Sequence, residues 1–260
     1  MLYSKSVLWV TILRGTALHS SDDQTAQPAD QYLLRAVAEE LKLPLMRIAR
    51  LAELSHLIKD SDQLGEQLQS IESNSELGIL LVESYLMGLV LSDSQQSLDL
   101  EPVSIGSVLN DIAHQLGPIA RQHNLDLEVQ VDGRHQLVMA NYRGLSAALL
   151  SVGSTLLTAH PTEVDKRPDP MVLAAYNYRG NLLTGVYGEQ PTIKGAWQRG
   201  TGLYGRARKP LLPLNSTNGA GLFVADTIFR AMSSRLRPAQ HHNKAGLAAN
   251  LIFSQQLQLV

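Results

Sequence analysis

Apolar residues recur at steps of three and four along the first third of the chain. From residue 31 they form one stripe, made of Leu34, Val37, Leu41, Leu45, Ile48, Leu51 and Leu54. After a polar turn over residues 59–65 comes a second stripe, made of Leu64, Leu68, Ile71, Leu77, Leu81, Tyr85 and Leu89. This spacing is typical of amphipathic helices, so we predict an antiparallel helical hairpin. Neither helix can bury its apolar face alone, and we expect a second copy of the chain to complete a four-helix bundle.

The pattern changes after residue 97, where short alternating segments typical of strands are mixed with helical ones. We predict strands over 103–105, 126–131, 171–175, 182–187 and 247–253, and helices over 107–123, 141–159 and 223–232. Residues 188–218 are rich in Gly, Pro and basic residues, which favours a long loop. The predicted organisation is an N-terminal segment and linker (1–30), a helical hairpin (31–97) and an α+β domain (98–260).

Composition narrows the class of protein. The net charge of −2 gives no bulk electrostatic reason to expect nucleic acid as a partner. The chain has no cysteine, which excludes disulfides and thiolate metal sites and fits a reducing cytoplasm. The first apolar run, residues 2–13, is shorter than the roughly 20 residues that span a bilayer. We therefore expect a cytoplasmic protein whose chain contains no membrane span.

A proline lies inside the first predicted helix, where it removes a backbone hydrogen bond and crowds the preceding turn. It belongs to the segment 39–45, EELKLPL. This segment resembles the phosphoacceptor box of sensor histidine kinases, His-Glu-Leu-Arg-Thr-Pro-Leu. The order of elements over about residues 30–255 also resembles the cytoplasmic core of that family. The resemblance implies a dimerising hairpin followed by a Bergerat-type ATP-binding domain, an α/β sandwich.

Within this box the phosphoacceptor is replaced. Glu39 stands where the family has its histidine, while Glu40, Lys42 and Pro44 follow at the expected positions. A carboxylate at position 39 repels a triphosphate, and its acyl phosphate would be an unstable relay species. In the family the proline relaxes the helix after the phosphoacceptor, which accounts for Pro44. We expect the box to keep this proline and to lack phosphotransfer.

The nucleotide motifs that the resemblance implies are also degenerate. Two hydroxyl residues replace the paired asparagines that help to hold Mg²⁺, the aspartate that reads adenine is absent, and two glycines of the last glycine box remain. The corresponding positions are Ser151, Thr155, Gly188, Glu189, Gly219 and Gly221. Glycines at a helix start allow close backbone approach to phosphate. No other enzyme motif and no metal-ligand spacing of histidines accompanies them.

Our first hypothesis is a non-catalytic signalling protein, a histidine kinase-like pseudokinase without cofactor or metal. It would dimerise through the hairpin and dock the receiver domain of a response regulator, or a phosphotransfer partner. The docking residues would lie along the upper hairpin, at Arg35, Glu39, Lys42 and Arg50. Small histidine phosphotransferases with a decayed nucleotide domain are a similar class, although they keep their histidine.

Two alternatives stay open. The chain could be a working ATP-dependent kinase or ATPase that uses Mg-ATP with the unorthodox ligands Ser151, Thr155 and Glu189. It could also be a structural adaptor whose bundle tethers two copies of another domain. The sequence names neither the signal nor the partner.

Overall fold

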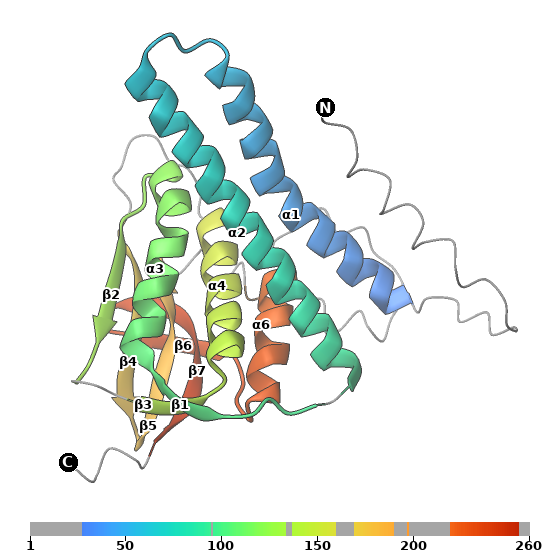
Figure 1. The fold of residues 1–260 in the computed structure, drawn as a ribbon. Helices are drawn as coiled ribbons and strands as arrows, with labels where there is room; N and C mark the ends of the chain where they lie inside the picture. The colour runs from blue at the N-terminus through green and yellow to red at the C-terminus, as the bar shows by residue number, and fades with distance from the viewer. Residues whose placement is uncertain are drawn as a thin grey trace, which may run out of the picture.

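The computed structural model describes residues 28–94, 96–133, 137–159, 169–189, 197 and 219–254, without the side chains of 28–35, 93, 94 and 122. The chain begins with two long helices, α1 (Pro28–Ser55) and α2 (Ser61–Ser94), which form the predicted hairpin (Figure 1). The predicted segment 1–30 falls almost wholly outside this description.

The turn of the hairpin is shorter than predicted, because α2 begins at Ser61 and not after Gly65. Asp60 supplies the reason. Its carboxylate accepts a hydrogen bond from the Asp62 N–H at 2.9 Å, and its carbonyl accepts one from the Leu64 N–H at 3.0 Å. These bonds satisfy free donors of the first helical turn. The helix therefore includes Gly65, which the sequence analysis had assigned to the turn.

Pro44 is accommodated inside α1, which is assigned as helix on both sides of it. The residue is buried, and its Cβ lies 3.9 Å from the position that a Cβ on Gly78 of α2 would occupy. The missing side chain of Gly78 thus leaves α2 close to the proline ring. Pro44 has a packing role here, whatever its effect on the helix axis.

The helix α2 has two apolar faces, of which one is buried within the chain. Leu77, Leu81, Tyr85 and Leu91 belong to the main hydrophobic core. The other face is exposed and carries Leu68, Ile79, Val82, Leu86 and Val90. Part of the apolar surface that the sequence analysis assigned to a second copy is therefore covered by the protein's own helices. Dimerisation stays a prediction, and the exposed face of α2 is the surface that would mediate it.

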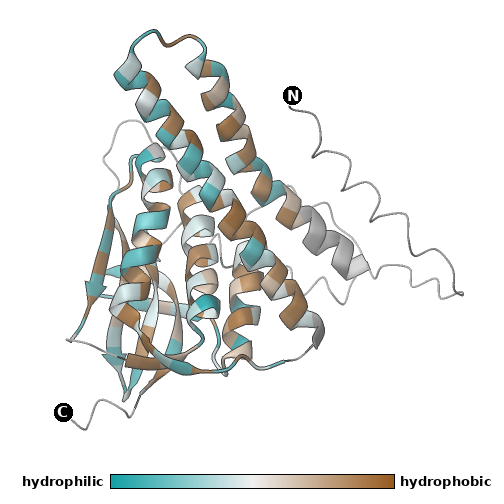
Figure 2. Cartoon of the chain, viewed as in Figure 1, coloured by the Kyte–Doolittle hydropathy of each residue, from teal (hydrophilic) through white to brown (hydrophobic). Residues whose placement is uncertain are grey.

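One helix among the described residues, the part of α2 over Ser61–Ser92, is long and apolar enough by length and composition to cross a membrane. A third of its most apolar window is buried inside the structure. The same test is passed by core helices of soluble proteins, and Figure 2 shows that polar residues interrupt the apolar ones along α2.

The remainder of the chain is an α+β layer. Its strands are β1 (Glu101–Ser104), β2 (Leu127–Val131), β3 (Leu137–Ala140), β4 (Met171–Tyr178), β5 (Asn181–Gly188), β6 (Arg237–His241) and β7 (Lys244–Phe253). Its helices are α3 (Ile105–Gln122), α4 (Tyr142–Ala159) and α6 (Ala220–Ala231). Every predicted helix and strand is present. Ile105, predicted as the end of a strand, belongs to α3, because the Ser104 side chain accepts a hydrogen bond from the Ser107 N–H and caps that helix.

Two strands, β3 and β6, were missed by the sequence analysis. They contain four and five residues, and β6 includes Arg237, Pro238 and Gln240, which disguise any apolar alternation. β3 pairs with β1 and with the distant β7, whereas β6 forms a hairpin with β7 directly after it in the chain. Short strands of this kind carry little local signal.

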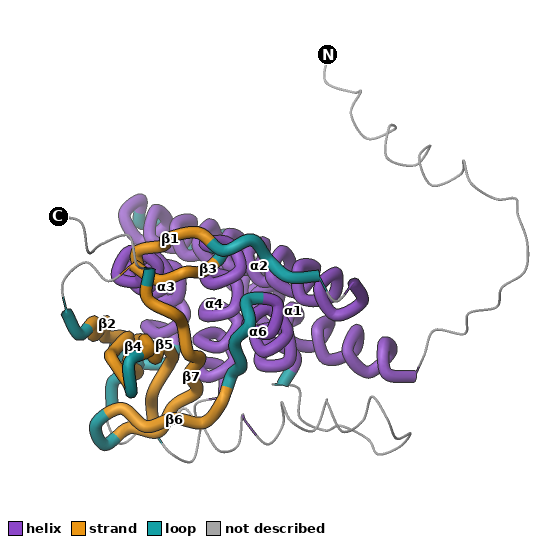
Figure 3. Tube along the Cα trace, turned by 90° about the horizontal axis from the view of Figure 1, so that it is seen from below, coloured by secondary structure: helices purple, strands orange, loops and turns teal. Residues whose placement is uncertain are grey.

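The seven strands form one sheet in the order β1-β3-β7-β5-β4-β2, with β6 paired to β7. Only β2 and β4 run parallel. The helices α3, α4 and α6 cover one face of this sheet, and the hairpin lies outside them (Figures 1 and 3). Strand residues therefore alternate between a helix-covered face and an outer face. The covered face holds most of the core.

Candidate functional site

The start of α6 is the place where the structure brings together four of the six predicted nucleotide-site positions and Glu40 of the phosphoacceptor box. The cap residue Gly219 has no side chain to accept hydrogen bonds from the first backbone N–H groups. The acceptor comes instead from α1. Glu40 Oε1 lies 2.9 Å from the Ala220 nitrogen, and Glu40 Oε2 lies 3.1 Å from the Gly221 nitrogen. A carboxylate thus occupies the positive end of the α6 dipole.

A third donor completes this arrangement. The Tyr85 hydroxyl of α2 donates a short hydrogen bond to Glu40 Oε2. Although Glu40 as a residue is only half-buried, its carboxyl group is desolvated, and this burial raises its pKa to about 7 against the lowering effect of the three hydrogen bonds. Burial and the neighbouring Glu40 raise the pKa of Tyr85 well above its usual value. Near neutral pH the carboxyl group can therefore gain or lose a proton.

The first turn of α6 is packed directly on α4. A Cβ built on Gly221 would lie 2.3 Å from Thr155 Oγ1, 2.9 Å from the Ser151 carbonyl oxygen and 3.3 Å from Glu40 Oε2. Ser151 and Thr155 are both buried, and the Ser151 hydroxyl has no hydrogen-bond partner within the described part of the chain. Gly221 is thus required by a close helix contact. The space next to it is filled by the protein's own atoms.

The other two nucleotide-motif positions lie elsewhere. Gly188 is the last residue of β5 and is in register with Ala245 of β7, and Glu189 follows it directly. The described contacts place Gly188 beside Met171 in the sheet and not beside α6. The structure therefore brings together Ser151, Thr155, Gly219 and Gly221. Gly188 and Glu189, the positions where the family has its adenine-reading aspartate, lie at the end of β5 instead.

The residues of the phosphoacceptor box differ in their surroundings. Glu39 is half-buried, Lys42 and Arg50 are exposed on α1, and Pro44 is buried against α2. Arg35 lies in α1, but its side chain falls outside the described part of the structure. The box thus presents one exposed cation, Lys42, and directs Glu40 inward, while Arg50 adds a second exposed cation further along α1.

Two contacts of α1, those of Glu40 with Tyr85 and of Arg47 with His123, were not predicted from the sequence. The sequence analysis counted Tyr85 as one more member of an apolar stripe, although a buried tyrosine hydroxyl generally needs a polar partner. That rule could have suggested a hydrogen bond, but not its partner 45 residues away. The second contact joins Arg47 Nη2 to His123 Nε2 at 2.7 Å and ties α1 to the end of α3. Partial burial lowers the pKa of Arg47.

The chemistry available at the start of α6 is that of an anion site that already contains an anion. Both carboxylate oxygens of Glu40 accept hydrogen bonds, and the two backbone donors nearest to the helix end are used. Among the described residues no group of three or more His, Asp or Glu side chains could hold a metal ion.

The sequence matches no protein-family model, and no curated protein matches it. Solved structures do match. The histidine kinase AdeS of Acinetobacter baumannii is 13% identical with a TM-score of 0.46, and the match covers 83% of this chain and 98% of that one. A bacterial phosphotransferase is 10% identical with a TM-score of 0.48, covering 89% and 98%.

Full-length ShkA, solved in complex with AMPPNP, is 18% identical with a TM-score of 0.48, and the match covers 90% of this chain and 46% of that one. The catalytic domain of histidine kinase ThkA matches over 60% of this chain and 96% of its own, at 9% identity and a TM-score of 0.44. At these values the matches describe a likeness in the arrangement of helices and strands to histidine kinase domains. They carry no statement about activity.

Proposed function

We propose that this protein is a two-component signalling protein of the histidine kinase type that does not phosphorylate itself with ATP. The observation that carries the proposal is the position of the Glu40 carboxyl group, which accepts hydrogen bonds from the backbone at the N-terminus of α6. The resemblance of residues 218–232 to the last glycine box places nucleotide phosphates at this helix end. The Glu40 carboxyl group already occupies the two backbone donors, and in its charged form it also repels a second anion.

Two further observations support the loss of nucleotide chemistry. Gly221 lies so close to Thr155 and Ser151 that no room remains between α4 and the first turn of α6. Position 39, where the family has its phosphoacceptor, carries a carboxylate. Each feature alone could be compensated, but together they remove both the donor and the acceptor side of a phosphoryl transfer.

The role that remains is binding. The exposed face of α2 and the exposed apolar residues of α1 form a surface that suits a second copy of the chain, as in the four-helix bundle that the resemblance implies. Ile79 is 59% and Leu86 is 57% exposed in the single chain. Lys42 and Arg50 are exposed on α1 and are suited to an acidic receiver domain. A cytoplasmic location belongs to the same proposal.

Nucleotide binding is the most direct test. The full chain should show no thermal shift with millimolar Mg-ATP, whereas a ligand present at 100 times its Kd would stabilise the fold by about 2.7 kcal/mol. Glu40→Ala frees the helix end, so inorganic phosphate should raise the melting temperature of this variant more than that of the native chain. Glu39→Gln, which leaves the α6 site intact, is the matched control. A saturable ATP shift in the native chain would instead favour an active kinase.

Self-association can be tested separately by light scattering. Ile79→Glu combined with Leu86→Glu places two charges on the exposed face of α2 and should convert a dimer into a monomer. Glu76→Gln, at an exposed polar position of the same helix, should leave the mass unchanged. A native chain that is monomeric at about 100 μM, a concentration at which interfaces of ordinary size are occupied, would refute the dimer. Binding of a purified receiver domain, weakened by Lys42→Glu and Arg50→Glu, would separate the signalling proposal from a plain structural adaptor.

A further inference from the structure

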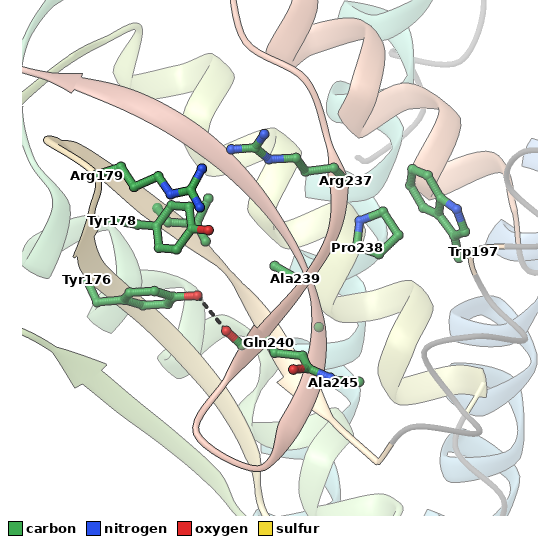
Figure 4. A pocket seen from close by; sticks show the side chains of 11 residues that line it. Tyr176, Tyr178, Arg179, Trp197, Arg237, Pro238, Ala239, Gln240 and Ala245 are labelled. Atoms are coloured by element: carbon green, nitrogen blue, oxygen red, sulfur yellow. Dashed lines mark hydrogen bonds between the residues drawn. The ribbon is translucent and has the colours of Figure 1, made fainter.

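The outer face of the sheet carries a pocket that the proposed function does not use. It has a volume of about 790 Å³ and is lined by residues of β4, β5, β6 and β7, with Arg179 and Tyr178 on the outer face and Trp197 packed against the helix-side core (Figure 4). This volume is within the range of pockets that hold small molecules. Its lining includes three small residues, of which Ala239 and Gly246 belong to the outer face and Ala245 to the helix-covered face.

The pairing of the strands places small residues in the outer face of the sheet at this pocket. Across the sheet, Val172, Tyr187, Gly246 and Ala239 form one row on the outer face. A Cβ on Gly246 would lie 2.1 Å from the Tyr187 ring, so the ring rests directly on the glycine backbone. Tyr176 is held beside this row, because its hydroxyl donates to the Gln240 carbonyl at 2.8 Å and its ring stacks on His241 at 4.6 Å between centroids.

Two arginines border the pocket from different elements. Arg179 comes from the turn between β4 and β5, and Arg237 opens β6. Figure 4 shows their side chains pointing toward one another at the rim, with the Arg179 guanidinium over the Tyr178 ring at 5.2 Å from its centroid. Within the described residues no carboxylate lies within salt-bridge distance of either guanidinium. Two like charges thus converge on one opening.

The backbone of Arg179 is a second and independent observation. The two-residue turn Arg179–Gly180 has φ values of 53° and 83°, as a type I′ hairpin turn requires. Asn, Asp or Gly is favoured at the first of these positions, and a residue with a long side chain is disfavoured there. Because arginine is disfavoured in this backbone conformation, its presence indicates that the side chain has a functional role.

We propose that this pocket binds a small aromatic anion, a molecule with one planar ring and one carboxylate or phosphate group. The anion is held between the guanidinium groups of Arg179 and Arg237, which suit both carboxylate and phosphate geometry. The ring lies on the outer face of the sheet, beside Tyr178 and over Leu183 and Ala239. Arg237 also borders a second cavity of about 670 Å³ together with Arg235 and with Arg230, which is paired with Asp226.

Trp197 provides a reporter for the test. The chain has two tryptophans, so Trp9→Phe leaves Trp197 as the single indole. Phenyl phosphate and benzoate are titrated into this full-length variant, and the fluorescence change and the heat of binding are followed. Both should bind with a Kd of about 1 mM or tighter. Inorganic phosphate, which lacks the ring, and benzyl alcohol, which lacks the charge, should bind at least about tenfold more weakly.

The arginine variants decide the outcome. Arg179→Asn suits the turn better and should raise the melting temperature while it weakens phenyl phosphate binding about tenfold or more. Arg237→Gln should weaken binding to a similar extent. Arg121→Gln, an exposed arginine on α3, is the matched control and should change nothing. Titrations that do not saturate with any of the four probes, or binding that survives both pocket variants, would overturn the proposal. Arg179 and Arg237 are not among the residues that meet at the start of α6, so failure here leaves the nucleotide test unaffected.

Discussion

The start of α6 and the pocket at the β4–β5 turn both carry groups that favour an anion, but the source of the anion differs. At α6 the donors are backbone N–H groups and the Tyr85 hydroxyl, and the anion is Glu40 of the same chain. At the turn the donors are two arginine side chains, and no described carboxylate meets them. An anion that is covalently part of the protein stabilises the fold. Cations without a carboxylate of their own are suited to a ligand from outside.

This difference predicts opposite responses to mutation. Removing the anion at α6 should damage the fold, because fixed backbone donors cannot move to water. Removing a cation at the pocket should spare the fold, because a long side chain at the surface is already solvated.

Glu40→Leu should lower the free energy of unfolding by about 3 kcal/mol, since two backbone donors and the Tyr85 hydroxyl lose their acceptor in a buried place. Urea denaturation monitored by circular dichroism measures this change. Glu39→Gln, one residue earlier on the same helix, should stay within about 0.5 kcal/mol of the native chain. Equal effects of the two substitutions would show that Glu40 has no special structural role.

The Glu40 carboxyl should also make stability depend on pH. Its pKa is about 7 in the folded protein and near 4.5 when unfolded, so the folded state binds the proton more tightly. The stability that this proton contributes is fully present below pH 4.5 and is lost as the pH rises through about 7. Relative to Glu40→Gln, the native chain should lose on the order of 2 to 3 kcal/mol between pH 5 and pH 8. A difference between the two proteins that is flat across this range would contradict the burial of the carboxyl group.

Gly221→Ala tests the packing under the same site. The added methyl group would meet Thr155 Oγ1 and the backbone of Ser151, so we expect a loss of about 2 kcal/mol in thermal or urea unfolding. Gly65→Ala, inside α2 with no atom within 4 Å of the added group, is its control and should gain about 0.5 to 1 kcal/mol. A neutral Gly221→Ala would mean that room for a ligand exists beside α6 after all.

The smallest changes are expected at the pocket. Arg179→Asn should stabilise the chain by about 1 kcal/mol, because asparagine tolerates the left-handed backbone of the turn. Arg237→Gln should alter stability by no more than about 0.5 kcal/mol. Differential scanning calorimetry of both variants checks these values. A large loss of stability in either would assign the arginines a structural role, like that of Glu40.

The sequence by itself determined the order of the elements. The two apolar stripes, the alternating strand segments and Pro44 within a helix are local patterns, and every helix and strand predicted from them is present. The errors lie at element ends and in short strands. The start of α6 was predicted three residues late, because the glycines at 219 and 221 have weak helix propensity and the group that caps them is remote.

Only the tertiary structure decided what the motif residues contact. Glu40 meets Ala220 and Gly221 across 180 residues of sequence, and Arg179 meets Arg237 at one pocket although each belongs to a different hairpin. Periodicity reports which side of an element is apolar, and it contains no information about which distant element will cover that side. The occupied helix end and the open pair of arginines are both products of such long-range packing.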